Sequence, residues 1–467
     1  MSESLLDHAR TLTESGKLDD AVLIAESILA ENPNHVPTIV LMAYISWKAN
    51  KFIWAYTFAQ RAAAIAPSEA LAWFNVGLAA SALWRMEESE SAFKTSARLA
   101  VDTHTRAMSY MNAAGLCIDF GRFRDAEEYS KKALEIEPYS PKSKSNMGFA
   151  LLGQGKWEGW EYYSYSLGLQ MREKMKFSDE PDWDFSPNKI VALYGEQGLG
   201  DEISFSSMIP DAAKDCEKVI FSCDKRMEGL FRRSFPGVKV YGTRKAKKED
   251  GNVWDKEDWQ IDASLALGEL GQHYRRRDEQ FSGKPFLVAD PDKRAMWRTM
   301  FDRKKKPCIG IAWTGGIEST GRKFRMLTLE QLKPILESVD AHWVSLQYKD
   351  AEADIRAFKS ENPHIEIVQH DCATLTKDYD DTAAMVSELD LVICIQTAVA
   401  HLAGALGKEC WVMLPKNSQW RYGTQGRTMP WYDSLQIFRQ RSLNDWMGIT
   451  GEMVGVLRKR FAMEKAA

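Results

Sequence analysis

The chain has 467 residues, of which 45% are hydrophobic and 27% are charged, and its formal net charge is −4. This length exceeds the size at which one hydrophobic core keeps growing, so we expect two or three domains. The nearly balanced charge argues against a dedicated nucleic-acid partner. No apolar run is long enough to cross a bilayer and no signal peptide is recognisable, so we expect a cytoplasmic protein without a transmembrane segment. The seven cysteines are scattered and never spaced CxxC, which argues against a disulfide framework or a structural zinc site.

The first third of the chain repeats itself every 34 residues. The markers are small residues and prolines, namely Ala9, Ala43 and Gly77, Pro33 and Pro67, and, after a slip of three residues near 103–105, Ala114 and Gly148. A small residue lets one helix of a hairpin approach its neighbour, and each proline ends the second helix where the next hairpin begins. The pattern therefore predicts a stack of helical hairpins with apolar side chains between them.

This spacing resembles the tetratricopeptide repeat over about residues 4–168, with four complete repeats and a fifth that ends near Tyr163. The resemblance implies a repeat domain over 1–170. Such a stack curves and presents a groove, so one interpretation is a docking surface for a protein, including an acceptor substrate. The alternatives are a rigid spacer and an arm through which the chain forms a homo-oligomer.

Residues 171–188 are rich in Asp and Pro and fit a linker. Short apolar runs of the buried-strand type then alternate with helical stretches, which predicts two Rossmann-like halves over 189–295 and 296–440. The expected strands are Ile190–Tyr194, Val219–Ser222, Val238–Tyr241, Cys308–Trp313, Trp343–Leu346, Ile365–Val368, Leu391–Ile395 and Cys410–Leu414. A last helix within 441–467 is expected to pack back on this module. Ligands bind beyond the carboxyl ends of such strands, so the cleft between the halves is the predicted site.

The strand over 391–395 turns directly into a helix of small residues. Free N–H groups at the start of that helix would attract a phosphate, Ala398 would let it come close, and Thr397 would cap the helix or donate a hydrogen bond. His401 lies in the first turn and would contact the same group. Tight packing of strand on helix, with a buried structural histidine, explains the same residues.

Two further segments carry charge near the expected cleft. Lys323 and Arg325 follow the turn at Gly315, where cations would neutralise a diphosphate, although solvated loop charge is the alternative. Asp201 follows the first strand of the α/β region and is the candidate base that would deprotonate an acceptor hydroxyl, or else a capping residue of the next helix. Gly198, Gly200 and Glu202 complete this loop on the acceptor side.

Two other patterns have weaker functional interpretations. Asp224 after the second strand would suit a dinucleotide ribose, but the preceding turn reads GxxGxG and not GxGxxG, which disfavours a dehydrogenase. The acidic run Asp378–Asp381 would chelate a metal or cap a helix, and capping is favoured because Thr382 and a helical pattern follow. We therefore predict no metal site.

Several of these segments together resemble the bacterial heptosyltransferase-like glycosyltransferases that carry tetratricopeptide repeats and, more distantly, the O-GlcNAc transferases. They are 198–201, 311–316, 397–408, 413–415, 420–423, 429–432 and 438–440. The resemblance implies a GT-B fold, in which two Rossmann-like halves face a cleft. It also implies a metal-independent reaction with a nucleotide-diphosphate sugar as co-substrate and no other cofactor. The donor would bind to the C-terminal half and the acceptor to the N-terminal half.

Carried over by position, the resemblance gives Asp201 the role of the base and gives the donor site to Gly315, Lys323, Arg325, Gln396, Thr397, Ala398, His401, Trp420 and Arg421. The resembling family usually has Asp where this chain has Gln396. The sequence therefore predicts an inverting glycosyltransferase that acts on a protein or a glycan. The alternative is a catalytically silent interaction scaffold whose α/β module only binds a nucleotide.

Overall fold

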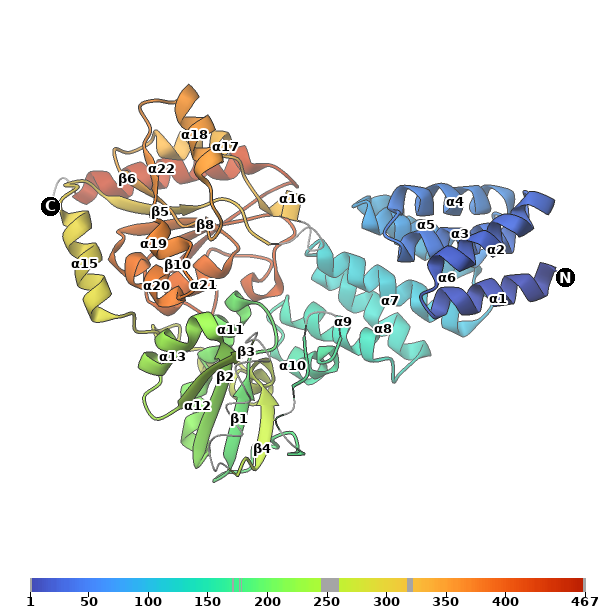
Figure 1. Cartoon of the computed structure of the whole chain (residues 1–467), viewed down its shortest axis with the longest axis horizontal. Helices are drawn as coiled ribbons and strands as arrows, with labels where there is room; N and C mark the ends of the chain where they lie inside the picture. The colour runs from blue at the N-terminus through green and yellow to red at the C-terminus, as the bar shows by residue number, and fades with distance from the viewer. Residues whose placement is uncertain are drawn as a thin grey trace. The chain divides into compact units, whose positions relative to one another are not determined.

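The computed structural model describes residues 2–169, 172–175, 177, 179–244, 260–316 and 322–464, and it divides into two compact units, Met1–Gln154 and Gly155–Ala467. We call them the repeat unit and the α/β unit. Figure 1 shows the repeat unit from blue to cyan and the two sheets of the α/β unit in green and in yellow to red.

The repeat unit consists of antiparallel helical hairpins. Its helices are α1 (Ser2–Glu14), α2 (Leu18–Glu31), α3 (Val36–Lys48), α4 (Phe52–Ile65), α5 (Ala70–Ala82), α6 (Met86–Leu99), α7 (Thr103–Asp119), α8 (Phe123–Ile136) and α9 (Pro141–Leu152). A residue with positive φ ends the first helix of each hairpin, at Gly16, Asn50, Trp84, Gly121 and Gly155. These positions are 34, 34, 37 and 34 residues apart, which confirms both the period and its single slip.

Small side chains set the distance between the helices, as the period predicts. A Cβ at Gly77 would lie 2.6 Å from the ring of Phe93, so the first helix of this hairpin touches the second at that point. Successive hairpins are also joined by amides, because Asn75 donates to the carbonyl of Val40 and Asn146 donates to that of Met111, both at 2.9 Å. An N-terminal helical repeat is therefore present.

The stretch that resembles the end of a fifth repeat belongs to the α/β unit. Residues 157–166 form two 3₁₀ turns and the short helix α10 (Trp160–Tyr163). The Trp157 indole donates to Asp278 at 2.7 Å and that of Trp160 donates to the carbonyl of Arg275 at 2.9 Å. The division between the units therefore falls before the composition break at 171, because the Trp160 indole is buried against the following domain and the Trp157 indole is hydrogen-bonded to it.

The first sheet of the α/β unit is parallel, with strand order β3-β2-β1-β4. Its strands are β1 (Ile190–Tyr194), β2 (Lys218–Asp224), β3 (Lys239–Arg244) and β4 (Ala263–Ala266). The helices of this half include α11 (Leu199–Ser206), α12 (Ile209–Asp215), α13 (Glu228–Ser234) and α14 (Gly271–Tyr274). The chain places β1, β2 and β3 in sequence and then returns to the other side of β1 with β4.

The second sheet is also parallel, with strand order β10-β9-β8-β5-β6-β7. Its strands are β5 (Cys308–Ala312), β6 (His342–Ser345), β7 (Ile367–Gln369), β8 (Leu391–Ile395), β9 (Cys410–Leu414) and β10 (Leu435–Arg439). Its helices are α15 (Pro291–Asp302), α16 (Arg322–Arg325), α17 (Leu329–Leu336), α18 (Glu352–Glu361), α19 (Asp371–Thr374), α20 (Tyr379–Glu388), α21 (Ala398–Ala405) and α22 (Trp446–Glu464). Helices α17, α18 and α22 cover one face, and α20 and α21 cover the other (Figure 1).

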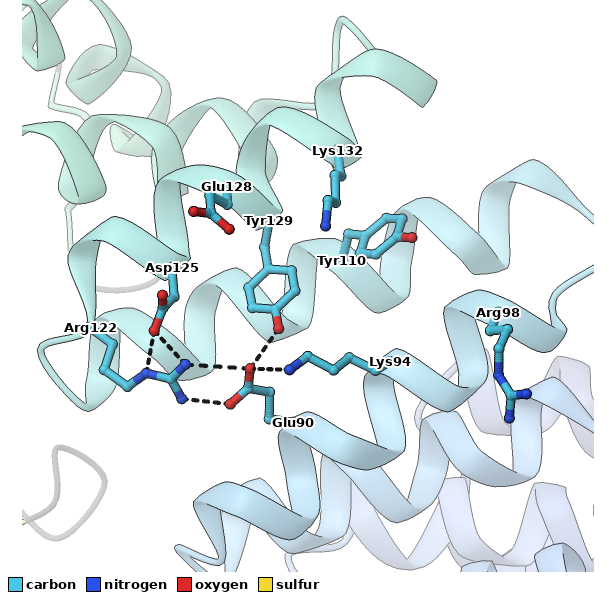
Figure 2. Close-up of a pocket in the computed structure, with 9 residues that line it drawn as sticks. All are labelled: Glu90, Lys94, Arg98, Tyr110, Arg122, Asp125, Glu128, Tyr129 and Lys132. Carbon is cyan, nitrogen blue, oxygen red and sulfur yellow. Dashed lines mark hydrogen bonds and ion pairs between the residues drawn. The ribbon is translucent and has the colours of Figure 1, made fainter.

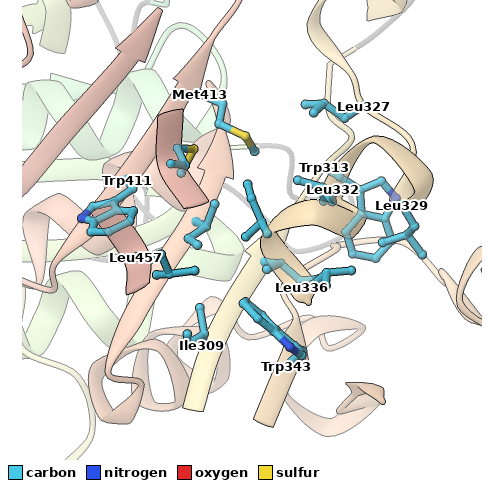
Figure 3. Packing of buried hydrophobic residues seen from close by; sticks show 14 of the residues in the cluster. Ile309, Trp313, Leu327, Leu329, Leu332, Leu336, Trp343, Trp411, Met413 and Leu457 are labelled. Atoms are coloured by element: carbon cyan, nitrogen blue, oxygen red, sulfur yellow. The ribbon is translucent and has the colours of Figure 1, made fainter. Parts of the chain in front are cut away.

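A single large core joins this sheet to α17 and α22. Figure 3 shows Ile309, Trp343 and Trp411 from the strands packed with Leu332 of α17 and Leu457 of α22. The C-terminal helix is thus part of the core of the second sheet. None of the helices in the described ranges combines the length and the apolar composition that a membrane span requires.

Candidate functional site

The two central strands of the second sheet mark its topological switch point. From β5 the chain proceeds outward through β6 and β7, whereas β8, β9 and β10 extend to the opposite side. In parallel α/β sheets this divergence opens a crevice at the carboxyl ends of the two strands. Here the loops beyond β5 and β8 bring Gly315 and Thr397 together, because a Cβ at Gly315 would lie 2.5 Å from the Thr397 methyl group.

Buried polar atoms without hydrogen-bond partners gather at this end of the sheet. Thr397 is the N-cap of α21, yet its hydroxyl makes no capping bond. The amide nitrogen of Gln396 also has no partner, although its oxygen accepts from the backbone of Gln419 at 2.9 Å. The loops after β9 and β10 add Asn417 Oδ1 and Gln440 Nε2. Such groups are costly to bury, so this cluster is suited to a polar ligand.

The first half of the α/β unit meets this cluster through α11. A Cβ at Gly200 would lie 2.9 Å from the His401 ring and 3.3 Å from Cα of Ala398, so the first turns of α11 and α21 touch. The next residue, Asp201, accepts a hydrogen bond from the backbone of Gly198 at 3.1 Å and thereby caps α11. Its other carboxylate oxygen pairs with Arg421, which follows β9.

The pair between Asp201 and Arg421 spans the two halves. The Arg421 side chain is 3% exposed, and that of Asp201 is 25% exposed. The guanidinium lies 4.8 Å from the ring centre of Phe205 and 4.7 Å from that of Trp420, a cation–π arrangement that holds the charge in place. Its Nε atom has no partner, so the guanidinium can still donate a further hydrogen bond.

Trp420 itself belongs to an aromatic cluster between the halves. Its ring lies 5.5 Å from that of Trp160, 6.0 Å from Tyr163 and 6.3 Å from Trp431. Its contacts in this structure are therefore packing contacts. They also connect the segment that follows the repeats to the loop that carries Arg421.

His401 lies beneath the start of α21 and does not face solvent. It is 3% exposed, and its ring nitrogens lie 3.3 Å from the hydroxyl of Tyr432 and 3.5 Å from that of Tyr422. Burial, with a smaller effect from the charge of Arg421, lowers the pKa of His401 to about 3. His401 thus lies among tyrosine side chains under the start of α21.

Glu202, predicted to lie in the acceptor-side loop, points into the first sheet. It is 2% exposed, accepts a hydrogen bond from the backbone of Asp224 at 2.7 Å, and pairs with Arg244 at 2.8 Å. Burial raises its pKa to about 7 even though Arg244 opposes the shift. Asp224, which would suit a dinucleotide ribose, is itself buried and holds Arg226 through two bonds of 2.9 Å.

The structure gives fewer contacts for the two cations, Lys323 and Arg325, that were predicted to neutralise a diphosphate. Arg325 is 8% exposed and ends α16, two residues before Leu327, whose backbone donates to the carbonyl of Trp313 at 2.9 Å beyond β5. The side chain of Lys323 lies outside the described residues. Asp378 caps α20 as predicted, by accepting from the backbone of Asp380 at 3.0 Å. Within the described ranges, no group of three or more His, Cys, Asp or Glu side chains is arranged to hold a metal ion.

The first sheet has its own switch point, between β1 and β4, and a side chain fills it. Arg172 is 3% exposed and pairs with Glu196 beyond β1 at 3.1 Å and with Glu269 beyond β4 at 2.6 Å. Its guanidinium stacks 3.9 Å from the ring centre of Tyr163. No sequence pattern indicated this cluster, because Arg172 lies in the predicted linker. The unpartnered polar atoms described above lie at the switch point of the second sheet, which is therefore the candidate ligand site.

The repeat unit holds a separate cavity of about 430 Å³ between α6, α7 and α8. Figure 2 shows its charged and aromatic lining, with Glu90 and Lys94 from α6, Tyr110 from α7, and Tyr129 and Lys132 from α8. The periodicity left a docking surface, a rigid spacer and an oligomerisation arm open for this unit, and it did not indicate where on the unit a ligand would bind.

No protein-family model matches the chain. A thermophilic TPR protein from Thermus thermophilus is 20% identical, with a TM-score of 0.32 over 36% of this chain and 91% of that one. PilF of Pseudomonas aeruginosa is 13% identical, with a TM-score of 0.35 over 46% of this chain and 87% of that one. Protein FlbA of Caulobacter vibrioides is 30% identical over 410 residues, which is 84% of this chain and 67% of FlbA. Because that similarity extends through both units, the chain belongs to the FlbA family.

Proposed function

We propose that the α/β unit is a glycosyltransferase of the GT-B type and that the repeat unit holds its polypeptide acceptor. The donor would be a nucleotide-diphosphate sugar bound at the carboxyl ends of β5 and β8. The observation that carries this proposal is the set of buried, unpartnered polar atoms at that switch point, above all Thr397 Oγ1 and Gln396 Nε2. A ligand that accepts hydrogen bonds would satisfy them.

An anionic ligand fits the character of these groups. The start of α21 presents backbone N–H groups, and the helix dipole adds a partial positive charge there. Gln396 supplies amide donors at the position where the resembling family usually carries an acid. Arg421 contributes a fixed positive charge nearby. A diphosphate, which only accepts hydrogen bonds, is complementary to this combination.

In the proposed reaction, Asp201 takes the proton from an acceptor hydroxyl group. At the same time the oxygen of that hydroxyl group forms a bond to the anomeric carbon of the donor. The bond from that carbon to the phosphate oxygen breaks, and the nucleoside diphosphate leaves with the electron pair. The configuration at the carbon is thereby inverted. Because Asp201 is paired with Arg421, the diphosphate competes for the guanidinium and frees the carboxylate to act as a base.

The same ion pair favours the second candidate, a scaffold that binds a nucleotide without turnover. A carboxylate that both caps α11 and neutralises a buried arginine has a complete structural role without chemistry. In that case Asp201 would stay paired with Arg421 when the nucleotide is bound. The two candidates therefore share the binding step and differ in whether the bound donor is turned over.

Calorimetric titration of the full chain with a panel of nucleoside diphosphates and their sugar conjugates, with EDTA present, tests the binding step. We expect one nucleotide to bind selectively. Thr397→Val, which removes only the unpartnered hydroxyl, should weaken that binding by about tenfold or more, the value of one hydrogen bond to a charged group. Thr328→Val is the matched control, because Thr328 also caps a helix of this half but its hydroxyl already accepts from Gln331. If no nucleotide binds, or if both variants bind like the natural chain, the proposed donor site is wrong.

Turnover separates the two candidates. Release of the nucleoside diphosphate from the selected sugar conjugate is measured in the natural chain and in Asp201→Asn, with a thermal melt to check folding. For a transferase we expect Asp201→Asn to bind the donor and to lose at least a hundredfold in rate, the usual contribution of a general base. Binding without release in the natural chain would favour the silent scaffold.

A further inference from the structure

The cavity between α6, α7 and α8 has a floor in which the charges are already neutralised. Glu90 accepts from Arg122 at 2.5 Å, from Lys94 at 2.8 Å and from the Tyr129 hydroxyl at 2.6 Å. Burial opposes ionisation, but these three donors prevail and lower the pKa of Glu90 to about 2. Arg122 also pairs with Asp125, so two carboxylates balance two cations.

The rim of the cavity is different, because its cations are not neutralised. Lys132 Nζ lies 5.7 Å from the ring centres of both Tyr110 and Tyr129, which stack 6.4 Å apart at 21°. Within the described ranges neither Lys132 nor Arg98 forms an ion pair or hydrogen bond with a carboxylate. Two rings therefore hold an ammonium group at the opening, with its N–H donors available. Figure 2 shows the Lys132 ammonium directed toward the Tyr110 ring.

We propose that this cavity binds an acidic segment of a partner polypeptide, with a Glu or Asp side chain on Lys132 and its aliphatic stem on the Tyr110 ring. The volume of about 430 Å³ suits one or two side chains and not a helix. A nucleic acid fits less well, because Glu128 at the rim would repel a chain of phosphates, while a single carboxylate can lie beside Lys132. The inference rests on the proposal that the repeat unit holds a polypeptide, and it names the chemistry of that polypeptide.

The binding is tested by fluorescence anisotropy of the full chain with a nine-residue peptide of Gly and Ser that has one central Glu and carries a neutral dye. We expect the Glu peptide to bind at least tenfold more tightly than the same peptide with Gln in place of Glu, because each charge-assisted hydrogen bond is worth about that factor. Lys132→Gln should abolish most of this preference, whereas Lys132→Arg should keep it.

Lys131→Gln is the matched control. Lys131 is the adjacent residue on α8, it is similarly exposed, and it is already paired with Glu127 at 2.6 Å. Both Gln variants remove one positive charge, so an effect of net charge alone would weaken binding equally in the two. Equal losses in Lys131→Gln and Lys132→Gln, equal affinities for the Glu and Gln peptides, or tighter binding of oligo-dT than of the Glu peptide would each overturn the proposal. The measurement contains no nucleotide sugar, so its failure is separate from a failure of the donor site.

Discussion

The two units differ in how far apart along the chain the partners of their buried ion pairs lie. In the repeat unit Glu90 and Glu127 each pair with the lysine four residues later, and Arg122, which completes the Glu90 network, comes from the next hairpin. In the α/β unit Asp201 and Arg421 lie 220 residues apart and Arg172 and Glu269 lie 97 apart. A change in the repeat unit should therefore be felt locally, whereas a change at a buried pair of the α/β unit should affect elements that are far apart in the sequence.

Arg172→Met should produce the largest effect and confine it to the α/β unit. The variant leaves Glu196 and Glu269 buried without their cation, which typically costs about 3–5 kcal/mol. Hydrogen exchange should show lost protection in β1 and β4 and unchanged protection in α1 to α8. Arg276→Gln breaks a pair of half-exposed side chains with Glu161 and should cost less than about 1 kcal/mol. Equal loss of protection in the repeat unit would show that the two units do not respond separately.

Gly200→Ala should come next, because its methyl group would push α11 away from α21. The added Cβ would meet the His401 ring at 2.9 Å and the Ala398 backbone at 3.3 Å. We expect a loss of about 1–3 kcal/mol in the free energy of unfolding, measured by urea denaturation. At Gly451 in α22 a new Cβ meets nothing within 4 Å, so Gly451→Ala should be neutral or stabilise the chain by up to about 1 kcal/mol. If the free energy of unfolding of Gly200→Ala equals that of the natural chain, the starts of α11 and α21 can move apart at little cost.

His401 should make the α/β unit sensitive to mild acid. Its pKa is about 3 in the folded chain, because it is buried, against 6.5 for an exposed histidine. The unfolded chain therefore binds the proton first, and stability is lost as the pH falls below 6.5. Between pH 7 and pH 5 the loss should be about 2 kcal/mol. His401→Phe should remove that part of the pH dependence, as measured by denaturation at each pH, and a curve that still matches the natural chain would exclude this role.

Glu90 should make the stability of the repeat unit fall at a lower pH than that of the α/β unit, and by a smaller amount. Burial raises its pKa, but its hydrogen bonds prevail, so the folded pKa of about 2 lies below the ordinary 4.5. Its contribution is thus complete above about pH 4.5 and is lost as the pH falls toward 2. By pH 3.5 the loss should be about 1.5 kcal/mol in the natural chain and absent in Glu90→Gln. Hydrogen exchange in α6 and α8 at each pH measures this difference, and a loss that begins near pH 6 would contradict it.

Much of the fold could be predicted from periodicity. The 34-residue spacing marked the hairpins because each needs a small residue and a turn at the same place, and the apolar runs marked β1, β8 and β9. The strand β4 was missed because Ala263–Ala266 is short and lacks the β-branched and aromatic side chains that are enriched in strands. The strand β10 was also missed, since Leu435–Arg439 alternates with polar residues as an edge strand does.

The candidate site could be predicted only in part. Thr397 and Gly315 were named because they follow strands of a parallel sheet, and the structure brings them together. The partner of Asp201 could not be predicted, since Arg421 is far away in sequence and nothing local specifies the pair. The same applies to Arg172, whose two carboxylate partners follow different strands. Pairs of this kind depend on how the sheets are assembled, which a single sequence does not encode as a local pattern.

The indole of Trp160 decides where the gene can be cut for recombinant expression. A fragment that starts at the composition break near 171 would lack this ring. The ring packs so closely against Gly271 that a Cβ atom at that glycine would lie 2.6 Å from it. The fragment would expose the apolar surfaces of Phe205 and Trp420, whose rings contact that of Trp160, and would be prone to aggregate. A fragment that starts at Gly155 keeps the ring, so crystallisation and ligand soaking of the catalytic candidate alone should begin from that residue.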